Sequence, residues 1–185
     1  MKKLLPFLSA GVLATTSACH NTSHHVNRFD NVRVEQMEAN NVSRKWFEKT
    51  VVCLNARREV RPDGGADHFL LVEHTPTPDF TLATGETLVL LVDGTRHTFT
   101  ATNSPSAIIH RPGYTTLVYR ATPQLFVELA NARQVELRLK GTTLVIERQL
   151  TRASIAGFRA YLMKYFQSPA APPDQPAATQ QTKRN

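Results

Sequence analysis

The chain has 185 residues, of which 41% are hydrophobic and 20% charged, with two cysteines and a formal net charge of +7. This length suits one domain with a sizeable core and is short for two. A disulfide-stabilised secreted domain would carry about four cysteines or more, so a core must hold this fold. The basic residues are spread out, without an aromatic–basic stacking motif, which counts against a nucleic-acid partner.

The first 18 residues have the pattern of a signal peptide. Two lysines precede the apolar run LLPFLSAGVLA at residues 4–14, which is too short for a lasting transmembrane helix, and the small residues TTSA lead to Cys19. This stretch resembles the lipobox of bacterial lipoproteins, in which cleavage falls just before a cysteine. Thr16 stands where that family commonly has an aliphatic residue, which leaves open an ordinary secretory peptide cut near Ala18.

The resemblance implies that residues 1–18 are removed and that Cys19 receives a diacylglycerol thioether and usually an amide-linked acyl chain such as palmitate. Two or three chains anchor stably, because each buried methylene contributes roughly 0.8 kcal/mol. An aspartate after the cysteine tends to retain such proteins in the inner membrane, so His20 implies the outer membrane, facing the periplasm. Loss of two lysines leaves 20 basic and 15 acidic residues, a net charge of +5.

Two terminal segments lack the features of folded structure. Residues 19–31 are polar and aperiodic, and we expect a flexible tether there. Its three histidines could bind a metal only weakly, so we predict neither a metal site nor a cofactor. Residues 168–185 are rich in Pro, Ala and Gln, which predicts disorder. One globular domain is therefore expected over residues 32–167.

The first half of this domain predicts strands and turns. Residues 32–50 fit either a helix or a loop with a short strand, and Trp46 and Phe47 are expected to plug one end of the core. TVVCLNARREV at 50–60 predicts a strand, in which Cys53 should be a buried small hydrophobic residue. The turn signal RPDGG separates it from a second strand, HFLLVEH.

Two hairpins and two helices follow. An Asp-Gly pair between apolar runs predicts a hairpin at residues 86–101, whose LVLLV strand should be central and covered on both sides. YTTLVYRAT predicts a further strand, and an alternating pattern around Gly141 a second hairpin. Thr122 should cap a helix with Leu125, Phe126 and Leu129 on one face. Thr151 should cap a final amphipathic helix whose apolar face consists of Ile155, Phe158, Leu162 and Tyr165.

These elements predict a mainly β (α+β) fold of about six to eight antiparallel strands, either a β-sandwich or a strongly bent sheet, with a short helix and a C-terminal amphipathic helix. The region from Leu88 to Phe166 is similar to small exported bacterial domains that mostly lack an assigned function. The similar motifs are a hairpin turn, a helix end and an alternating strand. The resemblance therefore bears on fold and compartment only.

Candidate chemical groups are scattered. No GxSxG motif is present, and no spacing singles out a catalytic pair among the carboxylates. The groups whose relative placement matters most for an enzyme are Glu73, Asp79, Glu86, His97 and His110. The densest basic cluster, Arg57, Arg58 and Arg61, is a candidate contact for an anionic surface such as lipid headgroups or an acidic cell-wall polymer.

The sequence therefore predicts a membrane-anchored envelope lipoprotein that acts as a non-enzymatic binding or scaffold module in the periplasm. Its expected partners are membrane lipid, reached through acylated Cys19, and an envelope protein or acidic polymer. The alternative is a hydrolase that acts on cell-wall or lipid substrates. A converging set of polar groups in a pocket would favour the enzyme, whereas a filled core with an exposed apolar patch would favour the binding module. The oligomeric state is left open.

Overall fold

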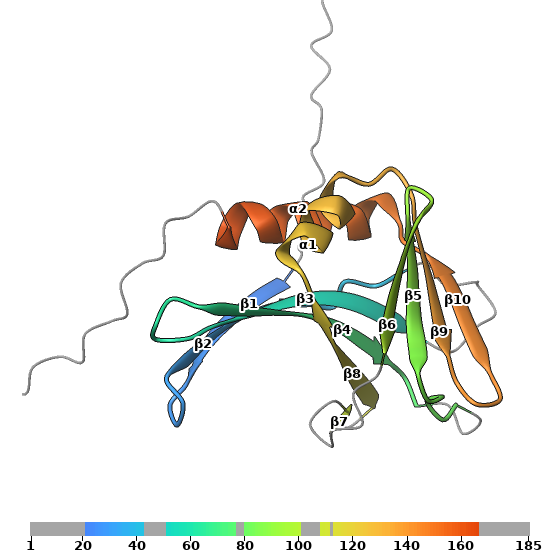
Figure 1. The fold of residues 1–185 in the computed structure, drawn as a ribbon, viewed down its shortest axis with the longest axis horizontal. Helices are drawn as coiled ribbons and strands as arrows, with labels where there is room; N and C mark the ends of the chain where they lie inside the picture. The colour runs from blue at the N-terminus through green and yellow to red at the C-terminus, as the bar shows by residue number, and fades with distance from the viewer. Residues whose placement is uncertain (1–20, 43–50, 77–79, 101–107, 112, 167–185) are drawn as a thin grey trace, which may run out of the picture.

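A computed structural model describes residues 21–42, 51–76, 80–100, 108–111 and 113–166. Within these ranges the fold is mainly β, with two antiparallel sheets and two helices (Figure 1). The six-stranded sheet contains, in spatial order, β1 (Asn21–Asn27), β2 (Val32–Glu38), β3 (Val52–Val60), β4 (Ala66–His74), β8 (Tyr114–Ala121) and β7 (Ile108–Arg111). The four-stranded sheet contains β10 (Val145–Gln149), β9 (Val135–Lys140), β5 (Glu86–Val92) and β6 (Thr95–Thr100). The predicted fold class is confirmed.

The hairpins form where turn residues and alternation predict them. Asp93 and Gly94 join β5 to β6 with φ angles of 47° and 87°, which Asp and Gly tolerate better than most residues. Leu90 of β5 faces the core and pairs with Leu137 of β9. Val89, on the opposite face, is buried too, which fits the expected central strand.

Both helices begin at the predicted threonine caps. Thr122 Oγ1 accepts the Leu125 N–H at the start of α1 (Pro123–Asn131). Thr151 Oγ1 accepts the Ser154 N–H at 3.0 Å at the start of α2 (Arg152–Tyr165). These side chains satisfy amide groups that have no partner within the helix.

The helices cover one face of the six-stranded sheet, and the four-stranded sheet stands beside them (Figure 1). The two sheets meet where β5 and β6 approach β8. There the Phe99 and Tyr119 rings lie 6.3 Å apart, and the Tyr119 hydroxyl lies 3.1 Å from that of Thr87. One apolar core fills the space between both sheets and both helices, with Phe126 and Phe158 fully buried at its centre.

The expected tether is in part a β-strand, which corrects the prediction for residues 19–31. β1 pairs with β2 over its whole length, from Asn21 opposite Glu38 to Asn27 opposite Val32. An edge strand needs only backbone hydrogen bonds to one neighbour, so a polar sequence forms it without an apolar pattern. β1 therefore brings ordered structure to within two residues of Cys19.

Two other uncertain regions also contain strands. Residues 32–38 form β2, which fits the alternative of a loop with a short strand, while residues 43–50 of that region lie outside the described residues. Residues 108–111 form β7 in the expected 101–113 loop. Trp46 and Phe47 lie outside the described residues, as do Cys19 with its leader and the C-terminal segment predicted to be disordered. No helix in the described ranges has the length and apolar character needed to cross a membrane.

Candidate functional site

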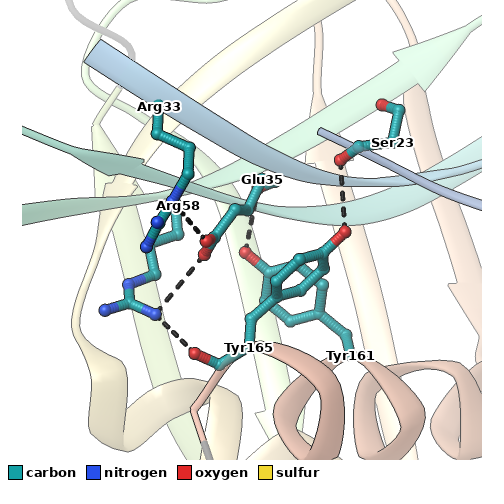
Figure 2. A network of polar contacts seen from close by, with 6 residues as sticks. All are labelled: Ser23, Arg33, Glu35, Arg58, Tyr161 and Tyr165. Atoms are coloured by element: carbon teal, nitrogen blue, oxygen red, sulfur yellow. Dashed lines mark hydrogen bonds and ion pairs between the residues drawn. The ribbon is translucent and has the colours of Figure 1, made fainter. Parts of the chain in front are cut away.

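A network of polar contacts joins the last turns of α2 to the first three strands (Figure 2). It draws one residue each from β1 and β3, two from β2 and two from α2. We call these six residues the α2 latch: Ser23, Arg33, Glu35, Arg58, Tyr161 and Tyr165.

Glu35 is the charged centre of the latch. It is 5% exposed, so most of its hydration is lost on folding. Two guanidinium groups compensate, with Arg33 Nε 2.9 Å and Arg58 Nη1 3.4 Å from its carboxylate oxygens. The side chains of Glu35 and Arg58 meet because these residues are register partners on adjacent strands.

The helix side of the latch uses two tyrosines and a carbonyl. The Tyr161 hydroxyl donates to the Glu35 carbonyl at 3.0 Å, and the Tyr165 hydroxyl donates to the Ser23 carbonyl at 3.4 Å. Arg58 Nη1 donates to the Tyr165 carbonyl at 2.5 Å. This last contact supplies a partner to one of the carbonyl groups that a helix leaves open at its C-terminus.

Burial shifts the pKa of two side chains in and near the latch. It raises the pKa of Tyr161 far above its usual range, with Glu35 adding to the effect, so this phenol remains a neutral donor. His68 lies against the Phe126 and Phe166 rings, whose centroids are 6.0 and 5.5 Å away. Burial lowers the pKa of His68, and the positive charge of Arg58 lowers it further.

The turn between β1 and β2 displays an aromatic side chain. Phe29 is 99% exposed. Its N–H donates to Asn27 Oδ1 at 3.1 Å, and Asn27 Nδ2 donates to Asp30 Oδ2 at 2.9 Å. An Asx-type turn of this kind fixes the backbone, so Phe29 is held out from the body on an ordered turn.

The structure does not bring the three predicted arginines into one patch. Arg57 and Arg58 are consecutive in β3 and so point to opposite faces of the sheet. Arg57 pairs with Glu59 at 2.5 Å, Arg58 belongs to the latch, and Arg61 pairs with Asp67. Contact between these arginines and an anionic surface stays a prediction, but every one of them has an acidic partner.

Three of the groups considered for catalysis each have a different partner. Glu73 accepts a hydrogen bond from Asn55 at 3.1 Å on the six-stranded sheet. His97 Nε2 lies 3.1 Å from Glu128 Oε2, which links β6 of the other sheet to α1. Glu86 pairs with Arg96 at 3.6 Å on that second sheet. The backbone of His110 is in β7, and Asp79 lies outside the described residues.

Two histidines and a cysteine of the six-stranded sheet are buried in the fold. His68 and His74 are on the same face of β4, as their spacing predicts, and both are buried. Cys53 is a free thiol, 4% exposed, which confirms its predicted burial. Burial and the nearby Glu73 raise its pKa to about 11, so it remains an unreactive thiol at neutral pH. In the described part of the chain, His, Cys, Asp and Glu form no cluster of three or more suited to a metal ion.

Sequence reasoning missed the latch and the Phe29 turn. A buried Glu35 was not expected, because Arg58 and Tyr161, which contact it from β3 and α2, lie 23 and more than 100 residues away in the chain. The alternation of Arg33 and Glu35 in RVE was the only local signal, since such residues share one face of a strand.

The fold and the latch define a small mainly β domain with two antiparallel sheets and a helical layer. No family model matches the chain. Comparison with curated proteins and with solved structures likewise finds no significant match.

Proposed function

We propose that the protein is a lipid-anchored bacterial envelope protein whose β-rich domain acts as a non-enzymatic binding module in the periplasm. The observation that carries the anchor is Cys19 itself, which follows an apolar leader and the small residues TTSA. Its acyl chains attach the domain to the membrane, and His20 favours the outer membrane. The placement of β1 adds a short spacer, because Asn21 is only two residues further on.

The arrangement of the domain supports a binding role on the side away from the anchor. The first residues of β1 contact the end of α2 through Lys164 and Tyr165. The turns at β1–β2, before β8 and at β9–β10 lie on the opposite side from the helices (Figure 1). Each of these turns carries at least one exposed apolar side chain. We call these side chains the distal rim: Phe29, Tyr114, Leu144 and Val145.

An envelope protein fits the distal rim better than an acidic polymer does. Exposed aromatic and aliphatic side chains are typical of protein contacts, where one buried aromatic residue often carries much of the binding energy. An acidic polymer would need unpaired positive charge, and the three arginines first considered for that contact are paired with carboxylates.

Mass spectrometry of the native protein tests the anchor. We expect a mature chain that starts at Cys19 and carries a diacylglycerol thioether and an amide-linked acyl chain. Cys19→Ala should release the protein from the membrane fraction. An unacylated residue 19, or an intact leader in a cytosolic fraction, would overturn the proposal.

A further inference from the structure

The outward face of α2 carries positive charge only. Its buried side consists of residues such as Ile155, Phe158 and Tyr161, which pack into the core. The opposite stripe is exposed and contains Arg152, Ala153, Ala156, Arg159, Ala160, Met163 and Lys164. Residues 152–165 include no aspartate or glutamate. We call this stripe the outer face of α2.

The outer face of α2 combines basic side chains with small residues between them. Three alanines keep its profile low between the basic side chains, and Met163 is 58% exposed. Arg159 donates to the Ala130 carbonyl at 2.9 Å and Lys164 to the Thr22 hydroxyl at 2.5 Å, and both of these acceptors are uncharged. A helix of 14 residues presents this stripe over about 21 Å.

The same face lies next to the expected anchor. Lys164 contacts Thr22, and Tyr165 contacts the Ser23 carbonyl. Thr22 follows Cys19 by three residues, which span at most about 11 Å even when fully extended. An acylated Cys19 therefore holds the C-terminal end of α2 close to the lipid headgroups.

We propose that the outer face of α2 lies on the anionic headgroups of the membrane that holds Cys19. This inference rests on the proposed lipid anchor. Basic side chains near an anionic bilayer are attracted to it, and an exposed methionine can enter the headgroup boundary while the arginine and lysine heads stay in contact with phosphate. The acyl chains and the helix together then fix the orientation of the domain, with the distal rim turned toward the periplasm.

Vesicle binding without acyl chains tests the face by itself. The mature chain from residue 19 keeps every described strand and helix, and Cys19→Ala removes the acylation site. This chain should co-sediment with phosphatidylglycerol-containing vesicles at low salt, and not with pure phosphatidylcholine vesicles. Arg152→Gln combined with Lys164→Gln should weaken binding about 25-fold, since each basic residue near the surface contributes about a five-fold factor.

A matched control removes the same charge elsewhere. Arg96 and Arg138 are exposed on the second sheet, so Arg96→Gln with Arg138→Gln changes the net charge equally. This double variant should weaken binding by less than about three-fold, because these residues do not lie on the outer face. Equal losses for both double variants, or binding that ignores phosphatidylglycerol, would overturn the proposal.

The acylated protein provides a second, independent measurement. A fluorophore attached at Met163→Cys should be quenched by headgroup quenchers in anionic vesicles, whereas one at Val145→Cys should not. Circular dichroism checks that each variant is folded. An acylated protein whose two probes behave alike would refute the docking of α2 and leave the anchor intact, whereas an unacylated Cys19 refutes the anchor.

Discussion

At the scale of single residues, the fold lowers the pKa of His68, and this change can be tested through the pH dependence of stability. It is buried against the Phe126 and Phe166 rings, with Arg58 close by. Burial and Arg58 lower its pKa from the usual 6.5, and Asp67 opposes them. The folded protein therefore holds this imidazole neutral at a pH where the unfolded chain has begun to protonate it.

The stability of the domain should fall as the pH drops below about 6.5. Below that value the unfolded chain binds a proton that folded His68 resists, so the free energy of unfolding declines until the pH passes below the folded pKa. Above 6.5 this contribution is complete. Urea unfolding at about pH 7.5, 6.5 and 5.5 measures the effect. His68→Gln should have a shallower dependence in this range, and an unchanged slope would contradict the assignment to His68.

At the scale of elements, the two tyrosine hydrogen bonds that attach α2 to the sheet differ in length and in burial. Tyr161→Phe removes a 3.0 Å hydrogen bond from a fully buried phenol and leaves the Glu35 carbonyl short of a partner. We expect it to lower the free energy of unfolding by about 1–2 kcal/mol. Tyr165→Phe removes a 3.4 Å contact from a half-buried position and should cost under about 0.5 kcal/mol. Chemical denaturation compares the two, and equal losses would contradict this ranking.

Elements with a local signal were predictable, and elements made by distant pairing were not. The Asp93–Gly94 hairpin and the Thr151 cap depend on a few adjacent residues, so their pattern is visible in the sequence. The formation of β1 depends on its pairing with β2, and no periodicity in its polar sequence predicts that pairing. Tyr161 was missed because the predicted apolar stripe of α2 ran through Phe158 and Leu162 and passed beside it.

For the candidate site, the sequence indicates which residue types are present, whereas their partners depend on the fold. Cys19 directly follows the leader-like pattern in the sequence, so the anchor could be proposed from adjacent residues, and acylation there stays a prediction. A cluster such as Arg57, Arg58 and Arg61 looks cationic in the sequence, but its charge is compensated by partners on other strands and turns. The fold shows that, among the described residues, the basic side chains on the outer face of α2 have no carboxylate partner on their own helix.

At the scale of the whole molecule, the helices and the distal rim lie on opposite sides. This division predicts different neighbours for two exposed apolar residues, Phe29 on the β1–β2 turn and Val127 on α1. A photo-crosslinking phenylalanine derivative placed at Phe29 in living cells should give discrete protein adducts. The same derivative at Val127 should not give them. Identical adducts at both positions, or none at Phe29, would contradict a binding role for the rim.

The edge position of β1 has a mechanical consequence. For a domain acylated at Cys19, any force between body and bilayer enters at Asn21, the first residue of a strand with a single neighbour. A pull directed away from β2 would break the β1–β2 hydrogen bonds one after another, starting from Asn21. Lys164 and Tyr165 form hydrogen bonds to Thr22 and Ser23, at the end of β1 where such separation would begin. If Cys19 is acylated, these contacts from the C-terminal helix would oppose separation of β1 from the sheet under a pull on the lipid.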